Sequence, residues 1–139
     1  MIRPAKNEDV IKINNLGRLL YFNFEKLYNI SEYLNNDKFI ILINEDSIIN
    51  GFIIVYKNID YYELEIIVVA ENSRKKGIAT NLLHNFIDNY CLKNDKILLE
   101  VSSVNFKASK LYEKFNFRTI NTRKKYYNDS DAYIMEKVI

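Results

Sequence analysis

The stretch Tyr61–Tyr90, YYELEIIVVAENSRKKGIATNLLHNFIDNY, decides the fold that the sequence predicts. It opens with a strand-like run over 61–69 that ends in consecutive apolar residues. A polar break over 70–73 and a basic, glycine-bearing turn over 74–80 follow. Apolar residues then recur at helical spacing, which indicates an amphipathic helix: Ala79, Leu82, Leu83, Phe86, Ile87 and Tyr90.

The basic turn is a candidate anion site. A strand that enters a glycine turn and then a helix directs several backbone N–H groups at one point, where the helix dipole adds partial positive charge. Such a point suits a phosphate or pyrophosphate, although a basic turn that merely solvates a helix start has the same residues. With Gly77 as its only glycine, the turn matches neither the common nucleotide loop nor the dinucleotide fingerprint.

Length and composition limit the possible classes. A chain of 139 residues predicts one domain over 1–139. A net charge of +2 gives no argument for nucleic acid as a partner. The single cysteine, Cys91, excludes an intrachain disulfide and fits a reducing compartment. Without a recognisable signal peptide or a membrane-length apolar run, we expect a cytoplasmic protein with no membrane contact.

The remaining segments alternate between strands and helices, which predicts an α/β fold. A helix between the strand 61–69 and a strand at 96–102 implies a right-handed crossover with parallel pairing. We expect Asn7 to cap the first helix and strand 96–102 to be covered on both faces. In the N-terminal half, the other expected elements are a strand at 2–4, a helix whose inner face runs from Val10 to Leu20, a second helical segment at 21–36, and strands at 39–44 and 48–57. In the C-terminal half, they are helices at 77–91 and 106–115 and a hairpin of 117–127 with 132–138 around Asn128, Asp129 and Ser130.

A second group of motifs follows the basic turn. Residues 99–105 read Leu-Glu-Val-Ser-Ser-Val-Asn, and residues 108–117 read Ala-Ser-Lys-Leu-Tyr-Glu-Lys-Phe-Asn-Phe. Together with Arg-x-x-Gly-x-Ala at 74–79, they resemble the motifs of the GNAT family, the Gcn5-related N-acetyltransferases. Asn116 stands where the family has glycine, and asparagine tolerates the left-handed backbone conformation better than most residues.

The C-terminal part is similar to one branch of that family. Arg-Lys-Lys-Tyr-Tyr at 123–127 and Asp-Ala-Tyr-Ile-Met at 131–135 resemble segments of the RimI branch, the ribosomal-protein-alanine N-acetyltransferases. The branch's Asn-Ile-Ala-Val and Pro-Trp elements have no counterpart here. This difference bears on which peptide is the acceptor and leaves the expected cofactor unchanged. The resemblance implies the single-domain GNAT fold, a mixed, mostly antiparallel sheet of about seven strands flanked by about four helices.

The resemblance also implies acetyl-coenzyme A (acetyl-CoA) as co-substrate. Its pyrophosphate would lie on the basic turn, Asn105 would hydrogen-bond the pantetheine arm, and backbone N–H groups of Ile67, Val68 and Val69 would bind the pantetheine and the oxyanion. A direct attack on the thioester requires no metal, and we expect His84 to be a surface or half-buried residue. The residues expected at the pyrophosphate are Arg74, Lys75, Lys76, Gly77, Ile78, Ala79 and Thr80.

Acetyl transfer needs a neutral amine and a proton for the departing thiolate. We expect Glu100 to act as the base, through water, because a carboxylate is costly inside a central strand and should face a cleft. Tyr112, placed at the thiol by the resemblance, is the candidate acid. A structural role in an ion pair is the alternative for Glu100, core packing is the alternative for Tyr112, and Glu63 and Glu65 are rival bases.

The acceptor follows from the same reasoning. Near pH 7, deprotonating a peptide α-amine costs roughly 1 kcal/mol, whereas a lysine amine costs about 4–5 kcal/mol. This difference makes an α-amine the chemically easier acceptor, and the resemblance to the RimI branch implies that the acceptor is a protein N-terminus, such as that of a ribosomal protein. We expect a monomer or weak homodimer. Phe24, Tyr126 and Tyr127 are expected to contact the acceptor. A small-molecule amine as acceptor, or a catalytically silent acyl-CoA-binding module, remains the alternative.

Overall fold

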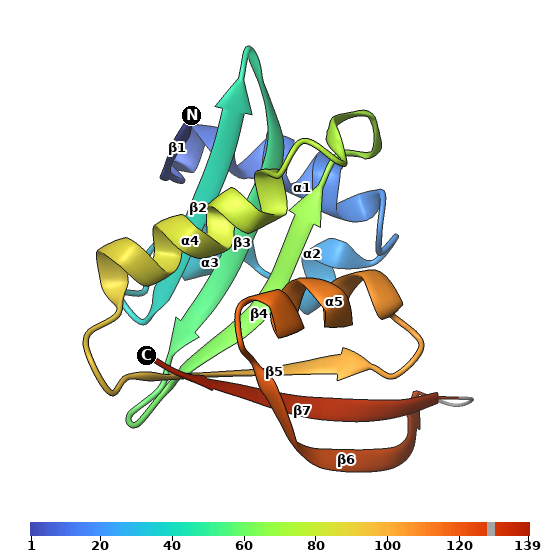
Figure 1. Ribbon diagram of the computed structural model, residues 1–139. Coiled ribbons are helices and arrows are strands. Elements are labelled where there is room, and N and C mark those ends of the chain that lie inside the picture. The colour runs from blue at the N-terminus through green and yellow to red at the C-terminus, as the bar shows by residue number, and fades with distance from the viewer. Residues whose placement is uncertain (128–129) are drawn as a thin grey trace. The chain divides into compact units, whose positions relative to one another are not determined.

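Seven strands form one mixed sheet in the computed structural model, which describes residues 1–127 and 130–139. Their order is β1-β2-β3-β4-β5-β7-β6 (Figure 1). β4 and β5 pair in parallel, and the pairs β1–β2, β2–β3, β5–β7 and β6–β7 are antiparallel, which confirms the predicted fold class. The strands are β1 (Ile2–Pro4), β2 (Phe39–Asp46), β3 (Ile48–Lys57), β4 (Tyr62–Val69), β5 (Lys96–Ser102), β6 (Arg118–Tyr127) and β7 (Ser130–Val138).

Contacts divide the chain into two compact units, and each is described by itself. The first unit comprises 1–57 and 65–91, and the second comprises 58–64 and 92–139. The expectation of one domain over 1–139 stays a prediction. The helices of the first unit are α1 (Val10–Arg18), α2 (Phe24–Leu27), α3 (Ile30–Tyr33) and α4 (Ile78–Tyr90), and the second unit holds α5 (Phe106–Lys114).

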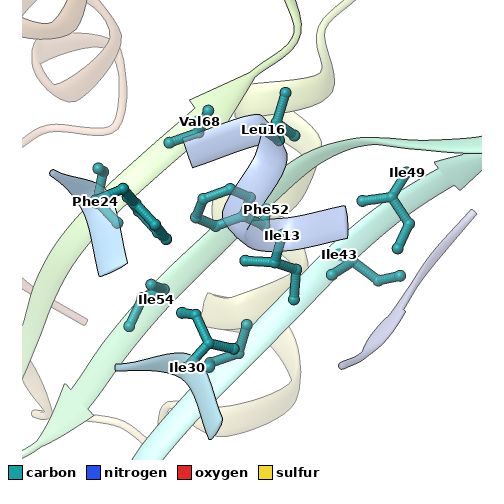
Figure 2. Packing of buried hydrophobic residues seen from close by; sticks show 11 residues of the cluster. Ile13, Leu16, Phe24, Ile30, Ile43, Ile49, Phe52, Ile54 and Val68 are labelled. Atoms are coloured by element: carbon teal, nitrogen blue, oxygen red, sulfur yellow. The ribbon is translucent and has the colours of Figure 1, made fainter. Parts of the chain in front are cut away.

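The core of the first unit lies on both faces of β3. α4 crosses β2 and β3 on one face, and α1, α2 and α3 cover the other face (Figure 1). Residues 49–55 of β3 are therefore buried without interruption, as expected for a strand between two helical layers. On the α1 face, Phe52 meets Phe24 edge-on, with ring centroids 5.7 Å apart, among aliphatic side chains from α1, α3, β2 and β4 (Figure 2).

The N-terminal helices differ from the expected pattern in two places. Asn7 begins a 3-10 turn instead of capping, and the Oδ2 of Asp9 accepts a hydrogen bond from the Lys6 N–H at 2.7 Å. The segment 21–36 forms two helices of four residues, α2 and α3, in place of one longer helical segment. Asn29 explains the second start, because its side chain accepts a hydrogen bond from the Glu32 N–H.

The second unit places β7 between β5 and β6. β5 has the predicted bounds, but its side chains alternate between buried and more exposed, so the expectation that both faces are covered was wrong. Asn105 caps α5 as predicted, with its Oδ1 accepting from the Ala108 N–H at 3.2 Å. Asn116 adopts the left-handed conformation at φ 66°. Asn128 and Asp129 of the expected hairpin turn lie outside the described residues.

Candidate active site

One group of predicted site residues, in the first unit, is the basic turn between β4 and α4. After β4, a short 3-10 turn over Glu71–Ser73 leads into three exposed cationic residues, Arg74 to Lys76. The Nε of Arg74 donates to the Val69 carbonyl at 3.3 Å, which ties the turn to the end of β4. Lys75 and Gly77 both have left-handed backbones, at φ 66° and 77°. These two residues let the chain reverse tightly before the helix begins.

Gly77 leaves the start of α4 open. Its φ of 77° would strain other residues, although no heavy atom outside Gly77 and its immediate chain neighbours lies within 4 Å of the position that a Cβ would take. The Asn81 N–H donates to the Gly77 carbonyl, so the regular helical hydrogen bonds begin there. The N–H groups of the preceding turn need partners outside the helix, and together with the helix dipole they suit an anion.

Gly51 of β3 fixes the position of this helix start. A Cβ at Gly51 would lie 2.8 Å from the Ile78 Cγ2 and 3.3 Å from the Val68 carbonyl oxygen. The first turn of α4 therefore packs directly on β3 and the end of β4. Sequence reasoning missed this role, although a glycine inside an apolar strand is a signal for close backbone approach.

The residues expected to bind pantetheine through their backbone lie at the end of β4. Val68 is buried in the core beside Phe52, whereas Ile67 and Val69 are half-buried. The role of their N–H groups at the pantetheine and the oxyanion stays a prediction.

Another group of predicted site residues, in the second unit, centres on Glu100 of β5. Its side chain is 28% exposed, and its Oε1 lies 3.4 Å from the Nη1 of Arg123 on β6. The guanidinium carbon of Arg123 lies 5.3 Å from the centre of the Tyr126 ring, a cation–π distance. Sequence reasoning did not pair Arg123 with Glu100. The rival carboxylates Glu63 and Glu65 are half-buried on β4, in the second and the first unit respectively.

α5 follows β5 closely and carries the other two predicted residues. The Oδ1 of Asn105 is used by the helix cap, which makes its amide Nδ2 the group suited to a ligand carbonyl. The Tyr112 side chain is buried, with its ring tilted against Phe117 at a centroid distance of 5.6 Å. Core packing, the alternative role for Tyr112, is therefore present, and donation from its hydroxyl stays a prediction.

Asp131 organises the end of the β6–β7 hairpin. Its Oδ1 accepts from the Lys125 N–H at 2.9 Å, and its Oδ2 lies 3.4 Å from the Lys124 Nζ. These two contacts hold the pKa of Asp131 below its ordinary value, and the hydrogen bond from the Lys125 backbone has the larger effect. Lys125 has a left-handed backbone at φ 52°, within an irregular register between Arg123 and Tyr127. Asp131 thus stabilises the bulge that carries Tyr126.

The acceptor residues have different surroundings from those expected. Phe24 is fully buried against Tyr28 and Phe52, and a Cβ on Gly17 would lie 2.5 Å from its ring. Its side chain therefore supports the segment from within, and direct contact with a peptide would require it to leave the core. Tyr126 is 52% exposed. The side chain of Tyr127 lies outside the described residues.

Two further findings concern metals and membranes. Among residues 1–127 and 130–139, no group of three or more His, Cys, Asp and Glu side chains is arranged to hold a metal ion. His84 is exposed on α4. In the same described part of the chain, no helix combines the length and apolar character needed to cross a membrane.

Known proteins resemble this chain along most of its length. Residues 19–139 match a sequence model described as the acetyltransferase (GNAT) domain. The chain is 32% identical to an N-alpha-acetyltransferase from Saccharolobus solfataricus, over 98% of this chain and 91% of that protein. A crystal structure of the ribosomal-protein-S18-alanine N-acetyltransferase from Escherichia coli has a TM-score of 0.86 at 22% identity, with coverage of 100% and 93%.

A GNAT family acetyltransferase from Elizabethkingia anophelis, solved with acetyl-CoA bound, has a TM-score of 0.78 at 20% identity, with coverage of 100% and 97%. At these identities the solved structures show a shared fold, while the match to the domain model and the archaeal relative show the family. The chain belongs to the GNAT acetyltransferase family and is an acetyl-CoA-dependent N-acetyltransferase.

Proposed function

We propose that this enzyme acetylates the N-terminal α-amine of a protein. The preferred acceptor is an N-terminal alanine, on a ribosomal protein or on another protein. The observation that carries the proposal is Glu100, an ion-paired carboxylate that is still 28% exposed on a strand whose neighbouring residues Leu99 and Val101 are buried. The similarity to an archaeal N-alpha-acetyltransferase supports the choice of an α-amine.

The basic turn is the proposed pyrophosphate site. Backbone N–H groups of Gly77 to Thr80 would donate to the phosphate oxygens, and Arg74, Lys75 and Lys76 would add charge that adapts to them. In the second unit, the amide Nδ2 of Asn105 would donate to a carbonyl of the pantetheine arm. These roles need no metal ion.

The chemistry requires two proton transfers. Glu100 accepts a proton from the acceptor ammonium through a water molecule, and the neutral amine then attacks the thioester carbonyl carbon. N–H groups at Ile67 to Val69 would stabilise the oxyanion while the carbon–sulfur bond breaks. Tyr112 donates its hydroxyl proton to the leaving thiolate. Because a tyrosine of pKa about 10 is a weaker acid than a thiol of pKa about 8.5, solvent must restore its proton promptly.

The acceptor amine decides how strong a base is needed. For an α-amine of pKa about 8, the neutral form is only roughly 1 kcal/mol less stable than the ammonium at pH 7, so a partly exposed carboxylate suffices. Tyr126 and Tyr127 are the proposed contacts to the first residues of the peptide. A cytoplasmic monomer or weak homodimer fits this role.

The test uses two peptides that differ in their reactive amine. One has a free N-terminal alanine and no lysine, and the other has a blocked N-terminus and one internal lysine. Mass spectrometry after incubation with acetyl-CoA should locate the acetyl group on the α-amine, and Glu100→Gln should slow this transfer at least about 100-fold. Acetylation of lysine alone would contradict the proposed acceptor. Acetyl-CoA binding without transfer to either peptide would favour a small-molecule amine or a silent binding module.

A further inference from the structure

Three strands place Arg123 and Glu100 on one face of the second unit. Ser102 of β5, Ala132 of β7 and Arg123 of β6 stand in one register row, and Glu100 is two residues from Ser102 on β5. Paired residues, and residues two apart on one strand, share a face of the sheet. The Arg123 side chain therefore crosses β7 at Ala132, whose small side chain leaves room, to reach Glu100 at 3.4 Å.

Two further contacts hold Arg123 in this position. The Tyr126 ring lies beneath its guanidinium at 5.3 Å. Tyr126 is in turn presented by the bulge at Lys125, whose N–H is bound by Asp131 at 2.9 Å. Asp131 itself is joined to the end of β5, because its backbone exchanges hydrogen bonds with Ser103. The guanidinium thus has support from β5, β6 and β7.

An ion pair in this setting contributes little to folding. The Arg123 side chain is 54% exposed, and exposed pairs of this kind are weak because water and salt screen them. The ion pair is made through the Oε1 of Glu100, at 3.4 Å from the Nη1 of Arg123. A cation on one side of a carboxylate favours the side-chain rotamers that keep one oxygen toward it, so the other oxygen, Oε2, is the one we expect to face a substrate.

We infer that Arg123 is a positioning residue that orients Glu100 for proton acceptance by its Oε2. The inference rests on the proposed role of Glu100 as the base. Arginine suits this task better than lysine, since its planar guanidinium contacts a carboxylate and an aromatic face at once. The catalytic carboxylate then reaches its working geometry before the acceptor binds.

The experiment is a double-mutant cycle on peptide acetylation, with Arg123→Gln, Glu100→Gln and the pair of them. We expect kcat to fall about tenfold in Arg123→Gln, with KM for acetyl-CoA and the melting temperature unchanged, because a misplaced base lowers only the chemical step. Arg123→Lys should recover part of the lost kcat. In the Glu100→Gln background, Arg123→Gln should have no further effect. Arg118→Gln, which removes the same charge from an exposed position of the same strand, is the matched control and should keep full activity.

The outcomes separate the inference from the proposed function. Full activity in Glu100→Gln would overturn the base assignment and the inference with it. Loss of activity in Glu100→Gln but not in Arg123→Gln would overturn the inference alone. The inference also fails if the two losses multiply independently in the double variant, or if Arg123→Gln raises kcat/KM. In that last case the guanidinium competes with the acceptor ammonium for Glu100.

Discussion

The two groups of candidate site residues, one in each unit, are built from different material. The turn before α4 is made by backbone: a left-handed Gly77, a helix start and the close packing of Gly51 on Ile78. The region around Glu100 is made by side chains that arrive from three strands, with Arg123 and Asp131 as its supports. The turn and the helix start follow from local sequence, whereas the packing of Gly51 and the contacts around Glu100 depend on how distant segments meet. The two groups should also respond differently to substitution.

The largest expected effect is in the side-chain region. Tyr112→Phe keeps the ring that packs on Phe117 but removes the proposed acid, so kcat should fall about 100-fold. The melting temperature and KM for acetyl-CoA should change little. Steady-state kinetics with the alanine peptide would measure this, with Tyr133→Phe as a control on β7. A variant as active as the wild type would leave Tyr112 with packing as its only role.

A stability effect comes next, in the first unit. Asp9 is buried and binds Arg3 at 2.8 Å and the Lys6 N–H at 2.7 Å, so Asp9→Asn should lower the unfolding free energy by about 2 kcal/mol. Denaturant titration at pH 7 would measure the loss. A change below about 0.5 kcal/mol would show that Glu45 alone satisfies Arg3.

The same pair predicts a pH dependence. The Arg3 guanidinium holds the pKa of Asp9 below its ordinary value of 3.8. The contribution of Asp9 to stability is therefore complete above that ordinary value and is lost as the pH falls through the lower pKa of the folded state. Denaturant titrations between pH 6 and pH 2 should converge for wild type and Asp9→Asn at the acidic end. Curves that stay parallel throughout would exclude this linkage.

The backbone region should respond through cofactor affinity. Gly77→Ala places a Cβ on a residue with φ 77°, which shifts the helix start, and we expect KM for acetyl-CoA to rise about tenfold with KM for the peptide unchanged. Steady-state kinetics with each substrate varied in turn would separate the two constants. A larger rise in the peptide constant would reverse the assignment of the two regions.

The smallest expected effect concerns the acceptor. Tyr126→Ala removes the aromatic face below Arg123 and a proposed peptide contact, so KM for the peptide should rise about threefold. KM for acetyl-CoA should not change, and the same two-substrate kinetics measure both. A rise in the acetyl-CoA constant alone would place Tyr126 at the cofactor instead.

The difference between the regions also explains which features could be predicted. The bounds of β5, the Asn105 cap and the left-handed Asn116 follow from local residue chemistry, and all three were predicted. The contact between Arg123 and Glu100 could not be predicted, because it depends on the register of β6 and β7 and on an irregularity at Lys125. The burial of Phe24 could not be predicted either, because it depends on the close approach of Gly17. In the sequence, an aromatic residue near a short helix has the same pattern whether its side chain lies in a core or in a groove.

The most direct test of the division between cofactor and acceptor chemistry is calorimetric titration of Glu100→Gln with acetyl-CoA, combined with its kcat on the alanine peptide. We predict that Glu100→Gln binds acetyl-CoA with the same dissociation constant as the wild type, while its kcat is at least about 100-fold lower, since the base acts only in the chemical step. A variant that loses acetyl-CoA binding together with activity would contradict this account, as would one that keeps its kcat.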